Sequence, residues 1–98
     1  MRYRHGDVIL RRVDSIPEKA QTKEGLTLAL GEVTGHSHRI TEGQAALFGF
    51  NEKTYLRVQS EIACLTHEEH KALKLPAGDY EILIQEEYAP EGWKKVQD

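Results

Sequence analysis

Apolar and polar residues alternate along several short stretches of this chain, as in strands that bury one face. The clearest cases are residues 26–30, 54–59 and 80–84, and a β-branched run at 6–13 is a fourth. Residues 45–50 are instead continuously apolar, over a length that suits a fully buried strand. These patterns predict a protein built mainly from β-strands.

The breaks between these stretches carry typical turn residues. Asn51-Glu52 predicts a tight connection between the two arms of a hairpin. Residues 62–65 predict a further short strand, and residues 76–78, Pro-Ala-Gly, predict a stop before the strand at 80–84.

Helix signals occur at only two places. The Thr66-x-x-Glu69 spacing matches a capping box and predicts one helical turn, which would carry His67 and His70 on a shared face. Residues 91–97 follow Pro90 and predict a short terminal helix.

About seven short strands with almost no helix predict an all-β fold, a small antiparallel β-barrel or sandwich with a short C-terminal helical turn. A barrel is favoured because closure removes strand edges that a short chain cannot otherwise cover. The chain has 98 residues, of which 39% are hydrophobic, enough for one core. We therefore predict a single β-barrel domain spanning residues 1–98.

Charge and cysteine content indicate the compartment of the protein and the classes of partner it can bind. Sixteen acidic residues against 13 basic ones give a formal charge of −3, which argues against nucleic acid as a partner. Cys64 is the only cysteine, so no intramolecular disulfide forms and a reducing compartment is expected. No apolar run approaches the roughly 20 residues that span a bilayer, and the N-terminus lacks the apolar stretch of a secretory signal. These features predict a cytoplasmic protein with no membrane partner.

Four of the five histidines lie in two short clusters. An extended backbone would turn His36 and His38 to one face, and His67 and His70 stand near the start of the predicted helical turn. Neutral imidazole binds first-row divalent metals near pH 7, so two clusters that meet would hold an ion such as zinc, iron or manganese. We therefore predict His36, His38, His67 and His70 as metal ligands.

Carboxylates beside these histidines extend the hypothesis from metal binding to catalysis. An ion that activates water, or acts as a Lewis acid on a small-molecule ligand, would need a group that moves protons. Glu69 and Glu42 are the candidates for that catalytic role. His5 stands alone in the sequence and receives no role.

The alternative hypothesis is a non-catalytic binding or assembly module. Its histidines would lie on a surface or at an interface, and exposed apolar strand edges would pair in a homo-oligomer.

The first histidine pair stands in a longer pattern. His36, His38, Glu42 and Gly49 resemble the first motif of the cupin family in residue type and spacing, and residues 76–78 are similar to the Pro-x-Gly core of its second motif. The resemblance implies a β-barrel in which two histidines and the glutamate bind a metal with one ligand from the second motif. The implied ligands are His36, His38, Glu42 and either Glu81 or His70.

A second resemblance concerns the start of the chain. The strand-forming run 6–13, a charged loop and then Gly31-Glu32-Val33 resemble the opening of the small co-chaperonin family. That resemblance implies a β-barrel whose copies assemble into rings.

Overall fold

The computed structural model describes residues 2–30, 37–84, 86–89 and 92–95. This part of the chain contains ten β-strands and no helix. The described residues contain no helix with the length and apolar character needed to cross a bilayer. The all-β fold class that the sequence predicts is therefore confirmed. The strands are β1 (Arg2–His5), β2 (Val8–Val13), β3 (Gln21–Lys23), β4 (Thr27–Leu30), β5 (Ser37–Glu42), β6 (Ala45–Phe50), β7 (Lys53–Thr66), β8 (Leu73–Ile84), β9 (Glu86–Ala89) and β10 (Gly92–Lys95).

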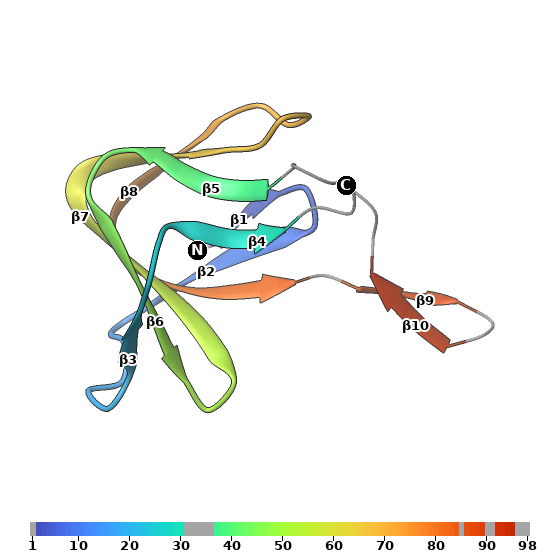
Figure 1. Cartoon of the computed structure of the whole chain (residues 1–98), viewed down its shortest axis with the longest axis horizontal. Coiled ribbons are helices and arrows are strands. Elements are labelled where there is room, and N and C mark those ends of the chain that lie inside the picture. The colour runs from blue at the N-terminus through green and yellow to red at the C-terminus, as the bar shows by residue number, and fades with distance from the viewer. Residues whose placement is uncertain (1, 31–36, 85, 90–91, 96–98) are drawn as a thin grey trace.

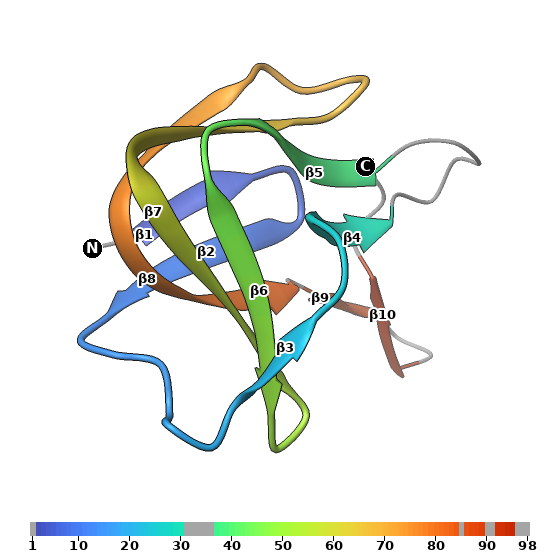
Figure 2. The same ribbon diagram turned by 60° about the vertical axis from the view of Figure 1, so that its left-hand side comes forward.

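Eight of these strands form one antiparallel sheet, with the main order β1-β2-β8-β7-β5-β4. β6 pairs with the first half of β7 and carries β3 on its other side. Figures 1 and 2 show that the sheet curls strongly, so that the β1–β2 hairpin comes round beside β4 and β5. Among the described residues no ladder joins β1 to β4, and the curl is half of a barrel rather than a closed one.

Two long strands replace turns that the sequence predicts. β7 continues through the expected break, with a shift of register between Val58 and Ile62. β8 passes through Pro76 and Gly78, where the sequence predicts a stop, and that prediction is wrong. Proline fits because the ladder with β2 covers only residues 79–84 of β8, so at Pro76 the described neighbour lies on the β7 side alone.

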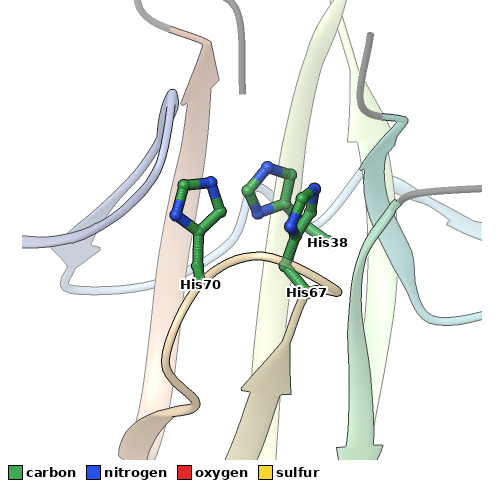
Figure 3. A group of neighbouring side chains, drawn as sticks. All are labelled: His38, His67 and His70. Atoms are coloured by element: carbon green, nitrogen blue, oxygen red, sulfur yellow. The ribbon is translucent and has the colours of Figure 1, made fainter. Parts of the chain in front are cut away.

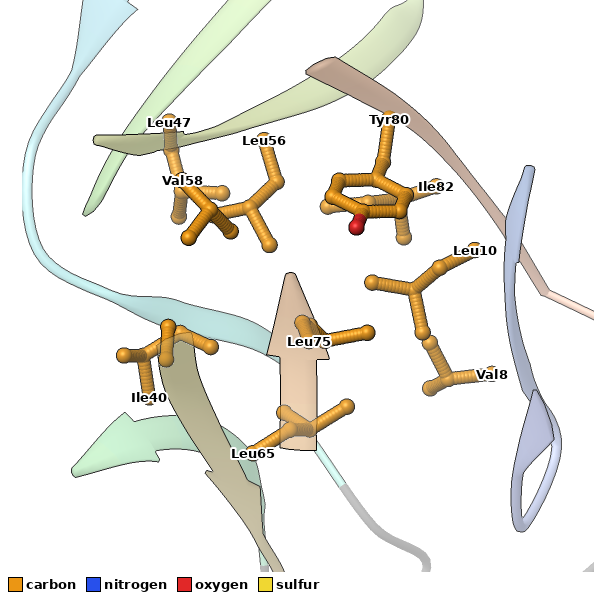
Figure 4. Close-up of a cluster of buried hydrophobic side chains, with 11 residues drawn as sticks. Val8, Leu10, Ile40, Leu47, Leu56, Val58, Leu65, Leu75, Tyr80 and Ile82 are labelled. Carbon is orange, nitrogen blue, oxygen red and sulfur yellow. The ribbon is translucent and has the colours of Figure 1, made fainter. Parts of the chain in front are cut away.

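One hydrophobic core lies inside the curl (Figure 4). It forms because alternate residues of each strand point inward, for example Val8 and Leu10 on β2 and Tyr80 and Ile82 on β8. The Tyr80 hydroxyl donates a hydrogen bond to the Pro76 carbonyl oxygen at 2.7 Å, which satisfies the polar end of a buried ring. The core residues are Val8, Leu10, Ile40, Leu47, Leu56, Val58, Ala63, Leu65, Leu75, Tyr80 and Ile82.

A glycine turn marks the place where β7 changes partner from β6 to β5. Gly43 has φ +90°, and a Cβ atom built on it would lie 2.5 Å from the Ile62 carbonyl oxygen. The Ser60 hydroxyl accepts a hydrogen bond from the Gln44 amide at 2.9 Å and holds this crossing together. Only glycine fits here, because the backbones approach so closely and φ is positive.

Neither predicted helical turn is found among the described residues, and residues 91, 96 and 97 of the second lie outside them. Thr66 is the last residue of β7, and its hydroxyl donates to the Arg39 carbonyl oxygen at 3.4 Å, so it does not cap a helix. Residues 67–72 form a loop without helical structure. Toward the C-terminus, β9 and β10 pair as a separate two-stranded sheet with Trp93 opposite Tyr88.

Candidate metal centre

Four histidines from three separate parts of the chain gather at one end of the curled sheet. His38 lies on β5, His67 and His70 lie in the 67–72 loop between β7 and β8, and His5 ends β1. The centroids of the four rings lie between 4.4 and 6.4 Å apart, pair by pair. The structure thus brings His38 against both histidines of the second cluster. His36 lies outside the described residues.

His38, His67 and His70 form a group that could hold a metal ion. Each offers one ring nitrogen, and these three atoms lie within 4.8 Å of one another. Figure 3 shows the three rings gathered above the loop. Around a tetrahedral zinc ion the donor atoms lie about 3.3 Å apart, so the rings need to close by no more than about 1.5 Å to bind one. His38 is fully buried, His67 is buried and His70 is half-buried.

A carboxylate clamp holds the histidine loop over β5. Glu68 accepts a hydrogen bond from the Ser37 amide at 3.0 Å with one oxygen, and from the Arg39 guanidinium at 2.8 Å with the other. These two donors lower the pKa of Glu68 from 4.5 to about 2. Because Ser37 and Arg39 flank His38, the clamp sets both histidines of the loop against that ring.

Replacing Glu68 by glutamine should lower the melting temperature of the metal-free protein by a few degrees at pH 7. A carboxyl group whose pKa is depressed by folding stabilises the fold above its unfolded pKa and loses that effect as it is protonated. The difference between wild type and Glu68→Gln should therefore shrink as the pH falls from about 4.5 toward 2. Thermal melting across this range measures it, with Glu24→Gln, at an exposed position, as the control. A difference that stays constant with pH would contradict the role of the clamp.

His67 is held by its own loop. Its Nδ1 accepts a hydrogen bond from the Glu69 amide at 3.0 Å. An acceptor nitrogen carries no hydrogen, so the neutral ring carries its hydrogen on Nε2. An ion that binds Nδ1 displaces this hydrogen bond, and an ion that binds Nε2 requires the hydrogen to move to Nδ1. Either way, metal binding at His67 opens the hydrogen bond to Glu69.

His5 and Asp7 complete the surroundings of His38, and neither was predicted as a site residue from the sequence. The rings of His5 and His38 meet Nδ1 to Nδ1 at 2.9 Å, and the other nitrogen of His5 lies 2.8 Å from the Lys71 carbonyl oxygen. Burial lowers the pKa of His5, and the three neighbouring imidazoles lower it further against the opposing effect of Lys71. Asp7 is buried in the β1–β2 turn, with Oδ1 3.2 Å from His38 Nε2.

The sequence signal for this pair is the tripeptide His5-Gly6-Asp7. Gly6 has φ +64°, a conformation that suits a tight turn between β1 and β2. A histidine and a carboxylate on either side of a turn glycine would have pointed to a second source of ligands. The run at 6–13 instead predicts a strand that begins at Gly6.

The other predicted site residues lie elsewhere. Glu42 is exposed at the far end of β5, about 13 Å along the strand from His38. Glu69 is exposed in the loop, and the group of ring nitrogens above includes neither carboxylate. Glu81 alternates with the core residues Tyr80 and Ile82, and its carboxylate is bound by Arg11 and Lys53. The catalytic roles of Glu42 and Glu69 stay predictions.

The sequence model of a family described as a domain of unknown function (DUF8820) matches residues 4–85. The chain belongs to this family. The DUF8820 match contains all five histidines and Asp7, and it ends between β8 and β9. The candidate metal centre thus lies within the residues that match the family, and the C-terminal hairpin lies outside them. No curated protein and no solved structure matches the chain.

Proposed function

We propose that this protein binds one divalent transition metal ion, zinc, iron or manganese, through His38, His67 and His70. The observation that carries the proposal is the convergence of three imidazoles from a strand and a distant loop, with their ligand atoms within 4.8 Å. Imidazole nitrogen suits zinc and iron in their common coordination geometries. The sequence predicts His36 as a further ligand.

Burial of the rings supports a metal site over the alternative of surface histidines at an assembly interface. The side chain of His38 has no exposed surface, and the residue His67 is 6% exposed. Polar rings that fold into the interior need bonds that replace those to water, and coordination to an ion supplies such bonds. A surface module would leave the imidazoles in solvent.

Metal analysis of the purified protein tests the proposal. Protein stripped with a chelator and dialysed against zinc should retain one ion per chain, and the bound zinc should raise its melting temperature. Magnesium, which prefers oxygen ligands, is the matched control and should give neither result. A protein that retains no transition metal, and whose melting responds to neither zinc nor chelator, would overturn the proposal.

A further inference from the structure

A chain of close contacts runs through the candidate centre from the β7–β8 loop to the β1–β2 turn. The Lys71 carbonyl oxygen meets His5 Nε2 at 2.8 Å, and His5 Nδ1 meets His38 Nδ1 at 2.9 Å. His38 Nε2 then lies 3.2 Å from Asp7 Oδ1. All three side chains are buried.

The hydrogens available along this series of contacts determine the state of its last contact, between His38 and Asp7. A carbonyl oxygen only accepts, so His5 Nε2 carries a hydrogen. A neutral His5 then has none on Nδ1, and the contact between the two Nδ1 atoms takes its hydrogen from His38. A neutral His38 therefore presents a bare lone pair at Nε2 to the Asp7 carboxylate. A proton or a metal ion shared by these two buried atoms would stabilise their 3.2 Å contact.

We infer that a divalent metal ion occupies this position, and that Asp7 is its fourth ligand beside His38, His67 and His70. The inference rests on the proposed function. The 3.2 Å separation of His38 Nε2 and Asp7 Oδ1 agrees with the separation of about 3.3 Å between two donors on one tetrahedral zinc ion. A proton would satisfy His38 and Asp7 alone, whereas an ion would also use His67 and His70. Asp7 is not part of the group of three nitrogens within 4.8 Å of one another, so its carboxylate and those two rings have to come closer to share one ion.

The position of Asp7 gives the ion a structural task. Asp7 lies in the β1–β2 turn, His38 lies on β5, and no ladder in the described part joins these two regions of the curled sheet. An ion bound by both would tie the sides of the half-barrel together where backbone hydrogen bonds do not. Three imidazoles and one carboxylate fill a tetrahedral site, and a filled set is typical of structural rather than catalytic metal sites.

Zinc affinity of the full chain, measured by competition with a chelating dye, tests the fourth ligand. Asp7→Asn keeps the shape of the side chain but removes its charge, and it should weaken zinc binding at least 10-fold. Asp14→Asn is the matched control, because Asp14 is exposed in the turn after β2, and it should bind zinc as the wild type does. His36→Ala, at the other predicted ligand, should also retain the wild-type affinity.

The outcomes separate this inference from the proposed function. Wild-type protein that binds no zinc would end both. Wild-type binding that Asp7→Asn leaves unchanged, or that His36→Ala abolishes instead, would overturn the role of Asp7 alone. X-ray absorption at the zinc edge of the wild type decides the matter even if Asp7→Asn fails to fold. Three coordinated imidazoles with one carboxylate support the inference, and four imidazoles contradict it.

Discussion

Replacing His38 by alanine should abolish the rise in melting temperature that zinc produces in the wild-type protein. Zinc at 100 times its dissociation constant stabilises a one-site protein by about 2.7 kcal/mol. For a domain of this size that corresponds to a rise of roughly 10 to 20 °C. His38 contributes the central ring of the cluster, in contact with His5, His67 and His70, so its loss should leave the zinc-dependent rise near zero.

For each variant, the melting temperature with zinc is compared with the melting temperature with chelator. This comparison removes the loss of stability that comes only from the empty space left by a buried ring. His70→Ala removes a half-buried loop side chain and should abolish the rise with little effect on the metal-free fold. Lys74→Ala, at an exposed position of β8, should keep the full rise. If His38→Ala and His70→Ala both responded to zinc as the wild type does, the cluster would not be the metal site.

Replacing Leu75 by alanine should lower the free energy of unfolding by about 3 kcal/mol, within the range for leucine truncation in a core. Leu75 is fully buried on β8 and packs within the core inside the curl (Figure 4). The removed methyl groups lose their burial and leave a cavity that the rigid sheet fills only in part. Because small domains are stable by only 5 to 15 kcal/mol, this is a large fraction of the total.

Chemical denaturation of the metal-free protein measures this loss, and Ile62→Ala is the matched control. Ile62 lies on the neighbouring strand β7, opposite Pro76, but it is 46% exposed. Its truncation should cost less than about 1 kcal/mol. Equal losses at the two positions would contradict the placement of the core inside the curl.

The sequence predicts the short-range features of this fold well. The alternation at 80–84 and the apolar run at 45–50 identify strands in the right places, because the inward face of each strand must be apolar. The fully buried strand predicted at 45–50 is wrong, since only Leu47 of β6 is buried and its other residues are partly exposed. The same parity argument predicts that His38 and Ile40 share a face, and both are buried. Asn51 and Glu52 have positive φ, as the tight turn predicted there requires.

Features that depend on contacts between strands could not be predicted from the sequence. From the sequence alone, Pro76 predicts the end of a strand. It fits inside β8 because the ladder between β2 and β8 does not reach it. β1 is polar, with two arginines and a histidine in four residues, so its pairing with β2 has little local signal. The sequence therefore gives His5 and Asp7 no role, although the β1–β2 hairpin brings both to His38.

The meeting of the two histidine clusters was a hypothesis that spacing alone did not test. It depends on β7 pairing with β5, which sets the 67–72 loop beside His38, and on the clamp from Glu68 to Ser37 and Arg39. In the sequence, Glu68 is only one of several carboxylates next to a histidine. Its role in positioning the loop depends on contacts between residues about thirty positions apart.

Anomalous diffraction at the zinc edge, from crystals of the zinc-loaded protein, tests the central claim most directly. The account predicts one strong peak per chain, about 2.0 to 2.1 Å from a ring nitrogen of each of His38, His67 and His70. A peak bound by other residues, or no peak at these three rings in crystals that contain zinc, would contradict it.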